Sequence, residues 1–228
     1  MTARIGALTR YHLELLLRSH AWLPPFLAYA LLMVVGVAAG DPLLGSLGLG
    51  AGALLPVSAW YVRGVLGAEP PASRACLVAA AGPVRVHLGA LLAALTASLV
   101  PAVGQVAVVW WTSGAVADPG APRHPEAWSA VLAGLTASVV CALLGVLAGA
   151  LANRPVPVRP QYGIPATLAL ATLLVVVPAS PANAAVSGLV SAARTGRIAV
   201  PWTSLLLAVV LLAAAGAGVA VLAGRRPE

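Results

Sequence analysis

The sequence predicts an all-α membrane protein with six transmembrane helices. Of its 228 residues, 61% are hydrophobic and 8% are charged, whereas a soluble domain carries about 25% charged residues. The charged residues also fall in groups, separated by long stretches that carry no charge. These stretches are 19–40, 42–62, 86–117, 127–153, 160–193 and 198–224. Each is long enough for a membrane-spanning helix, which needs about 20 apolar residues.

The arginines predict the orientation of these helices. With the N-terminus in the cytoplasm, ten of the thirteen arginines fall on inside segments, which are 1–20, 63–87, 153–161 and 225–228. Such an excess marks the cytoplasmic side, so both termini are expected in the cytoplasm. The protein itself is expected in a bacterial cell membrane. The net charge of +7 is then a topology signal and no sign of nucleic-acid binding. A soluble enzyme and a disordered regulator fit the composition equally poorly.

Residues 1–20 are expected to form an amphipathic helix in the cytoplasmic interface. At 100° per residue, one face collects Ile5, Leu8, His12, Leu15 and Leu16. The opposite face collects Arg4, Arg10, Glu14 and Arg18. This pattern suits a helix that lies in the membrane surface. Two alternatives are an extension of the first span and a cleavable signal peptide ending near VVGVAAGD.

The remaining residues, 21–228, are expected to form one transmembrane domain. Its predicted spans are 22–40, 43–65, 88–112, 128–152, 163–180 and 202–224. Within them, three glycine pairs have the GxxxG spacing that lets helix backbones approach closely. These pairs are Gly36/Gly40, Gly48/Gly52 and Gly145/Gly149.

The cytoplasmic loop 67–88 has the most informative sequence. Pro70-Pro71 and a candidate N-cap at Ser73 predict a short apolar helix over about 74–81, followed by a break at Gly82-Pro83. A compact helical loop of mixed polarity at the membrane surface is shaped to contact another protein. The alternative is an ordinary connector whose Arg74 and Arg85 serve topology alone.

Together, the six-helix plan, the N-terminal helix and this loop resemble the permease subunit of ABC-2-type (type V exporter-like) transporters. In that family the loop carries an acidic residue, a short helix ending in proline, a basic residue and a glycine. The matching residues here are Glu69, Leu77, Gly82-Pro83, Arg85 and Gly89. Pro70-Pro71-Ala72 departs from the pattern, because family members have more charges and a Gly-Thr pair there.

The resemblance implies a fold, partners and contact residues. An ABC ATPase subunit would dock on the loop, and a second permease chain, identical or homologous, would complete the translocation pathway. The residues implied in ATPase coupling are Glu69, Arg74, Leu77, Pro83 and Arg85. Family members also carry short re-entrant or surface helices between their last two spans, so Asn183–Arg194 in the outside segment 179–200 is expected to form one on the outer face. The alternative is a fifth helix that continues with a kink at Pro178 and Pro181.

The sequence predicts no catalytic residue, cofactor or metal site. A phosphate-binding P-loop needs a lysine, and all thirteen basic residues are arginines. Cys76 and Cys141 lie in separate segments, and the histidines are dispersed. Of the polar residues within spans, Gln105 is the best candidate for facing a pathway or a dimer interface. We therefore expect an export permease that contacts membrane lipid and is driven by a separate ATPase. The alternative is a non-transporting membrane scaffold or sensor subunit.

Overall fold

The computed structural model describes residues 2–153 and 163–225, and its regular elements are all helices. The first five are α1 (Thr2–Arg18), α2 (Leu23–Gly36), α3 (Leu43–Ala68), α4 (Pro71–Ala81) and α5 (Pro83–Thr112). They are followed by α6 (Ala127–Ala152), α7 (Gly163–Val176), α8 (Pro181–Thr195) and α9 (Trp202–Arg225). The predicted all-α class is confirmed for this part of the chain.

Three helices, α3, α5 and α6, are long and apolar enough to cross a membrane. The count rises to five if each of two bent helix pairs is one span. Within α9, the stretch Trp202–Gly216 is apolar but shorter than a span. The described residues therefore give three to five candidate spans, fewer than the six that the charge-free stretches predict.

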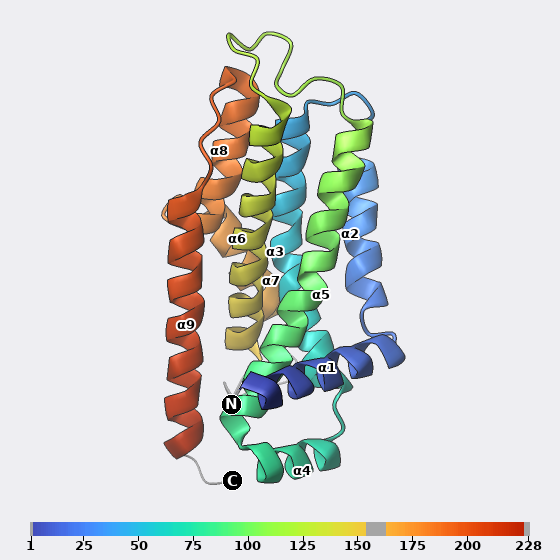
Figure 1. Ribbon diagram of the computed structural model, residues 1–228, viewed down its shortest axis with the longest axis vertical. Coiled ribbons are helices and arrows are strands. Elements are labelled where there is room, and N and C mark those ends of the chain that lie inside the picture. Colours follow the sequence, from blue (N-terminus) through green and yellow to red (C-terminus); the bar gives the residue numbers. More distant parts are fainter. Residues whose placement is uncertain (1, 154–162, 226–228) are drawn as a thin grey trace.

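α3 lies at the centre of the bundle. It packs against α2, α5, α6 and α8 along its length and against α1 at its C-terminal end. Figure 1 shows α2 and α5 on one side of α3, with α6, α8 and α9 on the other. The closest packing is with α6, where a Cβ on Gly149 would lie 2.7 Å from Val62 Cβ. This GxxxG pair of α6, Gly145/Gly149, does bring two helix backbones together, as its spacing predicts.

The first bent pair joins α1 to α2 at 74°. α1 lies across the end of the bundle, while α2 runs along it (Figure 1). The predicted apolar face of α1 packs against the bundle. Leu8, His12 and Leu16 on this face are buried, while Arg4 and Arg10 are exposed. α2 has 14 residues, about 21 Å at 1.5 Å per residue, which is short for a span on its own.

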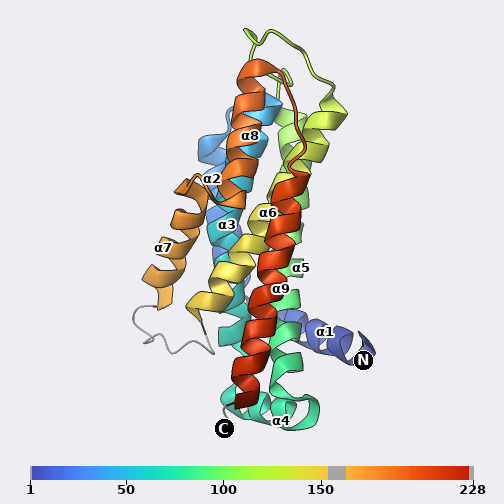
Figure 2. The ribbon, with the colours of Figure 1, turned by 90° about the vertical axis from the view of Figure 1, so that its left-hand side faces the viewer.

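The second bent pair consists of α7 and α8, and α8 contains the short helix expected over Asn183–Arg194. The chain bends by 50° between them, and α8 runs along the bundle beside α3 (Figure 2). Ser180 caps α8 by accepting a hydrogen bond from the Ala182 amide, and Pro181 occupies its first turn. Small buried residues such as Ala182 and Ala185 allow close packing that hydropathy does not reveal. A bend of this size at a short break is the geometry of a broken span or of a re-entrant loop.

The outer surface of the bundle is strongly apolar. Exposed large hydrophobic residues occur on α2, α5 and α9, among them Leu31, Val35, Val100, Val103, Trp111, Leu206 and Val210. Soluble monomers rarely expose apolar patches of this extent. Trp110 and Trp128 pair at the end opposite α4, with ring centroids 5.9 Å apart, and tryptophan is enriched at membrane interfaces. These are the features of a helical membrane protein.

Candidate functional site

The predicted coupling loop forms a helix, α4, joined to the bundle by two tight connections. α3 ends at Ala68 because Glu69 precedes a proline and adopts an extended conformation, with φ −83° and ψ 120°. Pro71 then begins α4, since proline suits the first turn of a helix. α4 therefore starts three residues before the expected position, and Ser73 lies inside it and does not cap it.

Gly82 makes the second connection. Its φ of 85° and ψ of 149° belong to a region that is essentially restricted to glycine. No atom outside the neighbouring residues lies within 4 Å of the position that a Cβ on Gly82 would take. Glycine is therefore required here by the backbone conformation and not by a steric clash with other residues. α5 begins at the next residue, Pro83, and Arg85 lies in its first turn. The predicted break at Gly82-Pro83 is confirmed.

α4 has no buried residue. It lies beyond α1 at one end of the bundle, and the helix it packs against is α5 (Figure 1). Arg74 is its one charged residue, and its exposed positions are Pro71, Ala72, Ala75, Cys76, Ala79 and Ala80. Leu77 and Val78 are half-buried. A small apolar helix is thus held at the tip of the molecule without cover.

The predicted residues Glu69 and Arg74 meet, and they meet beside a third residue, His12. The Glu69 side chain is 1% exposed, and its Oε2 atom lies 3.8 Å from Arg74 Nη1 and 3.7 Å from His12 Nε2. Both distances exceed hydrogen-bond range. Within the described residues neither carboxylate oxygen has a hydrogen-bond partner. A buried carboxylate is costly unless paired, and the charged group that faces this one is the Arg74 guanidinium.

His12 is oriented by its own helix. Its Nδ1 lies 2.8 Å from the Leu8 carbonyl oxygen, which can only accept, so Nδ1 carries a proton. The other ring nitrogen, Nε2, faces Glu69 and attracts it only when the imidazole is protonated on both nitrogens. Sequence reasoning placed His12 on the apolar face of α1 and missed this contact, because no local pattern connects it to Glu69.

Gly89 allows α1 and α5 to approach closely. A Cβ on Gly89 would lie 2.8 Å from Leu8 Cβ, so a side chain there would push α1 away. His87, two residues earlier on α5, is also buried, and its Nε2 has no hydrogen-bond partner among the described residues. The loop, α1 and the start of α5 therefore converge around buried polar groups.

No protein family, curated protein or solved structure matches this chain. Within the described residues, no group of three or more histidine, cysteine, aspartate or glutamate residues could hold a metal ion. What the site can do is therefore argued from its own geometry.

Gln105 belongs to a second polar cluster, in the interior of the bundle. Tyr29 Oη lies 2.7 Å from Gln105 Oε1 and 3.1 Å from the Gly50 carbonyl oxygen. The Gln105 amide donates to Ser138 Oγ, and the Ser138 hydroxyl donates to the Gly134 carbonyl at 2.8 Å. Tyr29, Gln105 and Ser138 are all buried. The cluster links α2, α3, α5 and α6 within one chain.

Sequence reasoning singled out Gln105 among the polar residues within spans, but it missed Tyr29. The Gln105 side chain is engaged on both its oxygen and its nitrogen. A role at a pathway or a dimer interface stays a prediction, and inside this chain Gln105 joins four helices.

Proposed function

We propose that this chain is the membrane-spanning permease subunit of an ABC exporter of the ABC-2 type. It is driven by a separate ATPase subunit, and a second permease chain completes its translocation pathway. The observation that carries the proposal is α4, an apolar helix that projects from the end of the bundle with none of its residues buried.

The composition of α4 favours a protein partner. Its exposed positions are mostly alanine, which presents a shallow apolar surface with little side-chain entropy to lose on binding. An uncovered apolar surface marks an interaction site. Arg74, whose side chain is 30% exposed, adds one charge at the edge of this surface.

The two connections of α4 suit the transmission of a displacement. Glu69-Pro70 joins α4 directly to α3, and Gly82 joins it directly to α5. Neither connection has slack, because each is one or two residues long. A force applied to α4 would act on α3 and α5. Both helices run along the bundle, and α3 lies at its centre.

We assign ATP binding and hydrolysis to a different subunit. The phosphate-binding motif GxxxxGK[ST] depends on a lysine that contacts the phosphates, and the basic residues of this sequence are all arginines. The proposal therefore needs an ATPase that binds at α4. The positive-inside distribution of arginine puts α4 and both termini in the cytoplasm of a bacterial cell.

The proposal retains six membrane crossings. They are the segment 22–40 that contains α2, then α3, α5, α6, the bent pair α7–α8, and α9. The interior polar groups of Tyr29, Gln105 and Ser138 bond to one another, which favours a pathway between two chains over one through a single chain.

Co-purification tests the proposal. The tagged chain is extracted from its native membrane in mild detergent, and associated proteins are identified by mass spectrometry. We expect a protein with a Walker motif in stoichiometric amount, whose ATP hydrolysis rate changes when the chain is removed. Association without such a protein would contradict the proposal and favour the alternative, a non-transporting scaffold or sensor subunit.

A further inference from the structure

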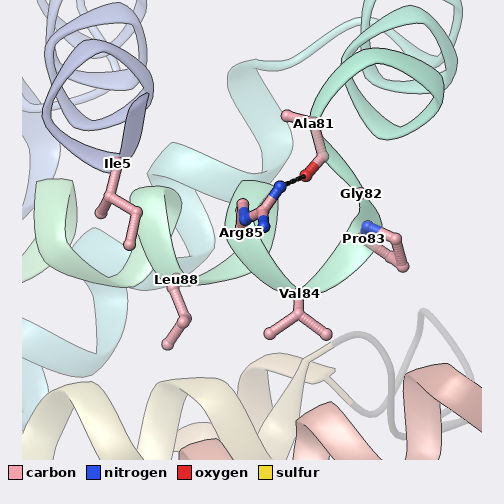
Figure 3. Close-up of a pocket in the computed structure, with 7 residues that line it drawn as sticks. All are labelled: Ile5, Ala81, Gly82, Pro83, Val84, Arg85 and Leu88. Carbon is pink, nitrogen blue, oxygen red and sulfur yellow. Dashed lines mark hydrogen bonds between the residues drawn. The ribbon is translucent and has the colours of Figure 1, made fainter. Parts of the chain in front are cut away.

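A cavity of about 440 Å³ lies in the corner between α1 and the α4–α5 turn. Its lining residues are Ile5, Ala81, Gly82, Pro83, Val84, Arg85 and Leu88. Figure 3 shows Val84 and Leu88 pointing to the same side of α5, Ile5 on the neighbouring α1, and Arg85 turned toward the Ala81 carbonyl oxygen. The wall is apolar except for this one guanidinium and exposed backbone.

Arg85 has unused hydrogen-bonding capacity. Its Nη1 donates to the Ala81 carbonyl oxygen at 3.3 Å, which uses one of the five N–H donors of a guanidinium. Within the described residues Arg85 makes no salt bridge, and no carboxylate lines the cavity. A fork of free donors beside an apolar wall fits a phosphate group attached to a hydrocarbon chain.

The surface of α1 next to the cavity is also basic. α1 lies across the bundle end here (Figure 1), and its exposed face carries Arg4, Arg10 and Arg18. Glu14, the acidic residue on that face, is paired with Arg10 at 2.8 Å. Basic residues at the membrane surface attract anionic lipids, and the cavity adds a defined place for one headgroup.

We propose that this corner binds the phosphate headgroup of an anionic phospholipid, with Arg85 contacting the phosphate and Ile5, Val84 and Leu88 contacting the start of an acyl chain. A cavity of this volume is within the range of small-molecule sites and takes the headgroup region, while the rest of the lipid lies along the apolar surface of the bundle. A bound lipid would contact α1, α4 and α5 together.

Lipid binding by the purified full chain tests this inference without any ATPase, so it stands or falls separately from the permease proposal. Native mass spectrometry and titration in detergent compare short-chain phosphatidylglycerol with short-chain phosphatidylcholine. We expect tighter binding of phosphatidylglycerol, and we expect Arg85→Gln to weaken it by about fivefold, the contribution of one arginine near a membrane surface.

Two further variants separate the site from general charge. Arg197→Gln makes the same charge change at an exposed position between α8 and α9, at the end of the bundle opposite α4, and should leave binding unchanged. Val84→Trp keeps the charge but fills the cavity, and it should weaken binding with the fold intact. Equal binding of both lipids, an equal effect of Arg85→Gln and Arg197→Gln, or full displacement of the lipid by millimolar inorganic phosphate would overturn the proposal.

Discussion

The buried carboxylate of Glu69, at the end of α3, faces the Nε2 atom of His12 on α1 at 3.7 Å. Arg74 of α4 approaches the same oxygen at 3.8 Å. The consecutive helices α3 and α4 and the distant helix α1 thus meet at one buried carboxylate. Because the Glu69 carboxylate is not hydrogen-bonded, its electrostatic neighbours determine how much this contact stabilises the packing of α1, α3 and α4.

Removing Arg74 should destabilise the protein more than removing Glu69. Arg74→Gln leaves a buried carboxylate without its arginine partner, which we expect to cost about 1–3 kcal/mol. Glu69→Gln costs less, because Arg74 is partly exposed and water can hydrate it. The measurement is thermal unfolding of the purified variants in detergent. The double variant should be more stable than Arg74→Gln alone. The opposite ranking of the two single variants would contradict the role given to this charge.

Gly50 is predicted to be sensitive because of its neighbour Gln105. A Cβ at Gly50 would collide with Gln105 Oε1, so Gly50→Ala must displace the amide that links Tyr29 to Ser138. Overpacking of this kind costs about 1–3 kcal/mol, which should lower the thermal unfolding midpoint. Adding Gln105→Ala removes the collision and should restore part of the loss.

A matched control lies on the same helix. No atom outside the local chain is within 4 Å of a Cβ at Gly67, so Gly67→Ala should be neutral or stabilise by about 0.4–1 kcal/mol. Equal effects of Gly50→Ala and Gly67→Ala would show that the contact with Gln105 is not tight.

Gly82→Ala should loosen α4 without unfolding the bundle. A side chain in this backbone region costs about 1–3 kcal/mol, and α4 has no buried residue to hold it in place. We therefore expect faster proteolysis between α3 and α5, with an unchanged thermal unfolding midpoint of the bundle. Gly67→Ala serves again as the control. Unchanged proteolysis would mean that the turn adopts another conformation at no cost.

The long central spans could be predicted from the sequence within a few residues. α3, α5 and α6 are uninterrupted apolar stretches bounded by charges, and their ends follow from prolines, glycines and charged residues. The predicted span 43–65 is α3, Leu43–Ala68, and the predicted span 128–152 is α6, Ala127–Ala152. Hydropathy is sufficient where a single helix fills the whole stretch.

Hydropathy does not reveal how α7 and α8 are arranged. The stretch 160–193 carries no charge, yet the chain bends between α7 and α8. The sequence predicted a short helix over Asn183–Arg194, which is α8, but not the packing of this helix against α3. Its small residues bury against α3, and hydropathy does not register packing that depends on close approach.

The candidate site could be predicted in part. Glu69, Arg74 and Arg85 were recognised from the order of residues in the loop. The contact of Glu69 with His12 could not be, because it depends on how α1 crosses the end of α3 and α5. Likewise Gln105 was recognisable as a lone polar residue in a span, whereas Tyr29 as its partner required the packing of α2 against α3.

The central claim is that α4 is the docking surface for an ATPase, and one comparison tests it most directly. Ala79→Glu places a charge on the exposed face of α4, and Ala115→Glu places the same charge on an exposed alanine at the opposite end of the bundle. The measurement is the amount of Walker-motif protein that co-purifies with each variant and its ATP hydrolysis rate. We predict that Ala79→Glu weakens the association at least about tenfold, because an unpaired charge is costly to bury. Ala115→Glu should match the wild type. Equal association of both variants would contradict the account.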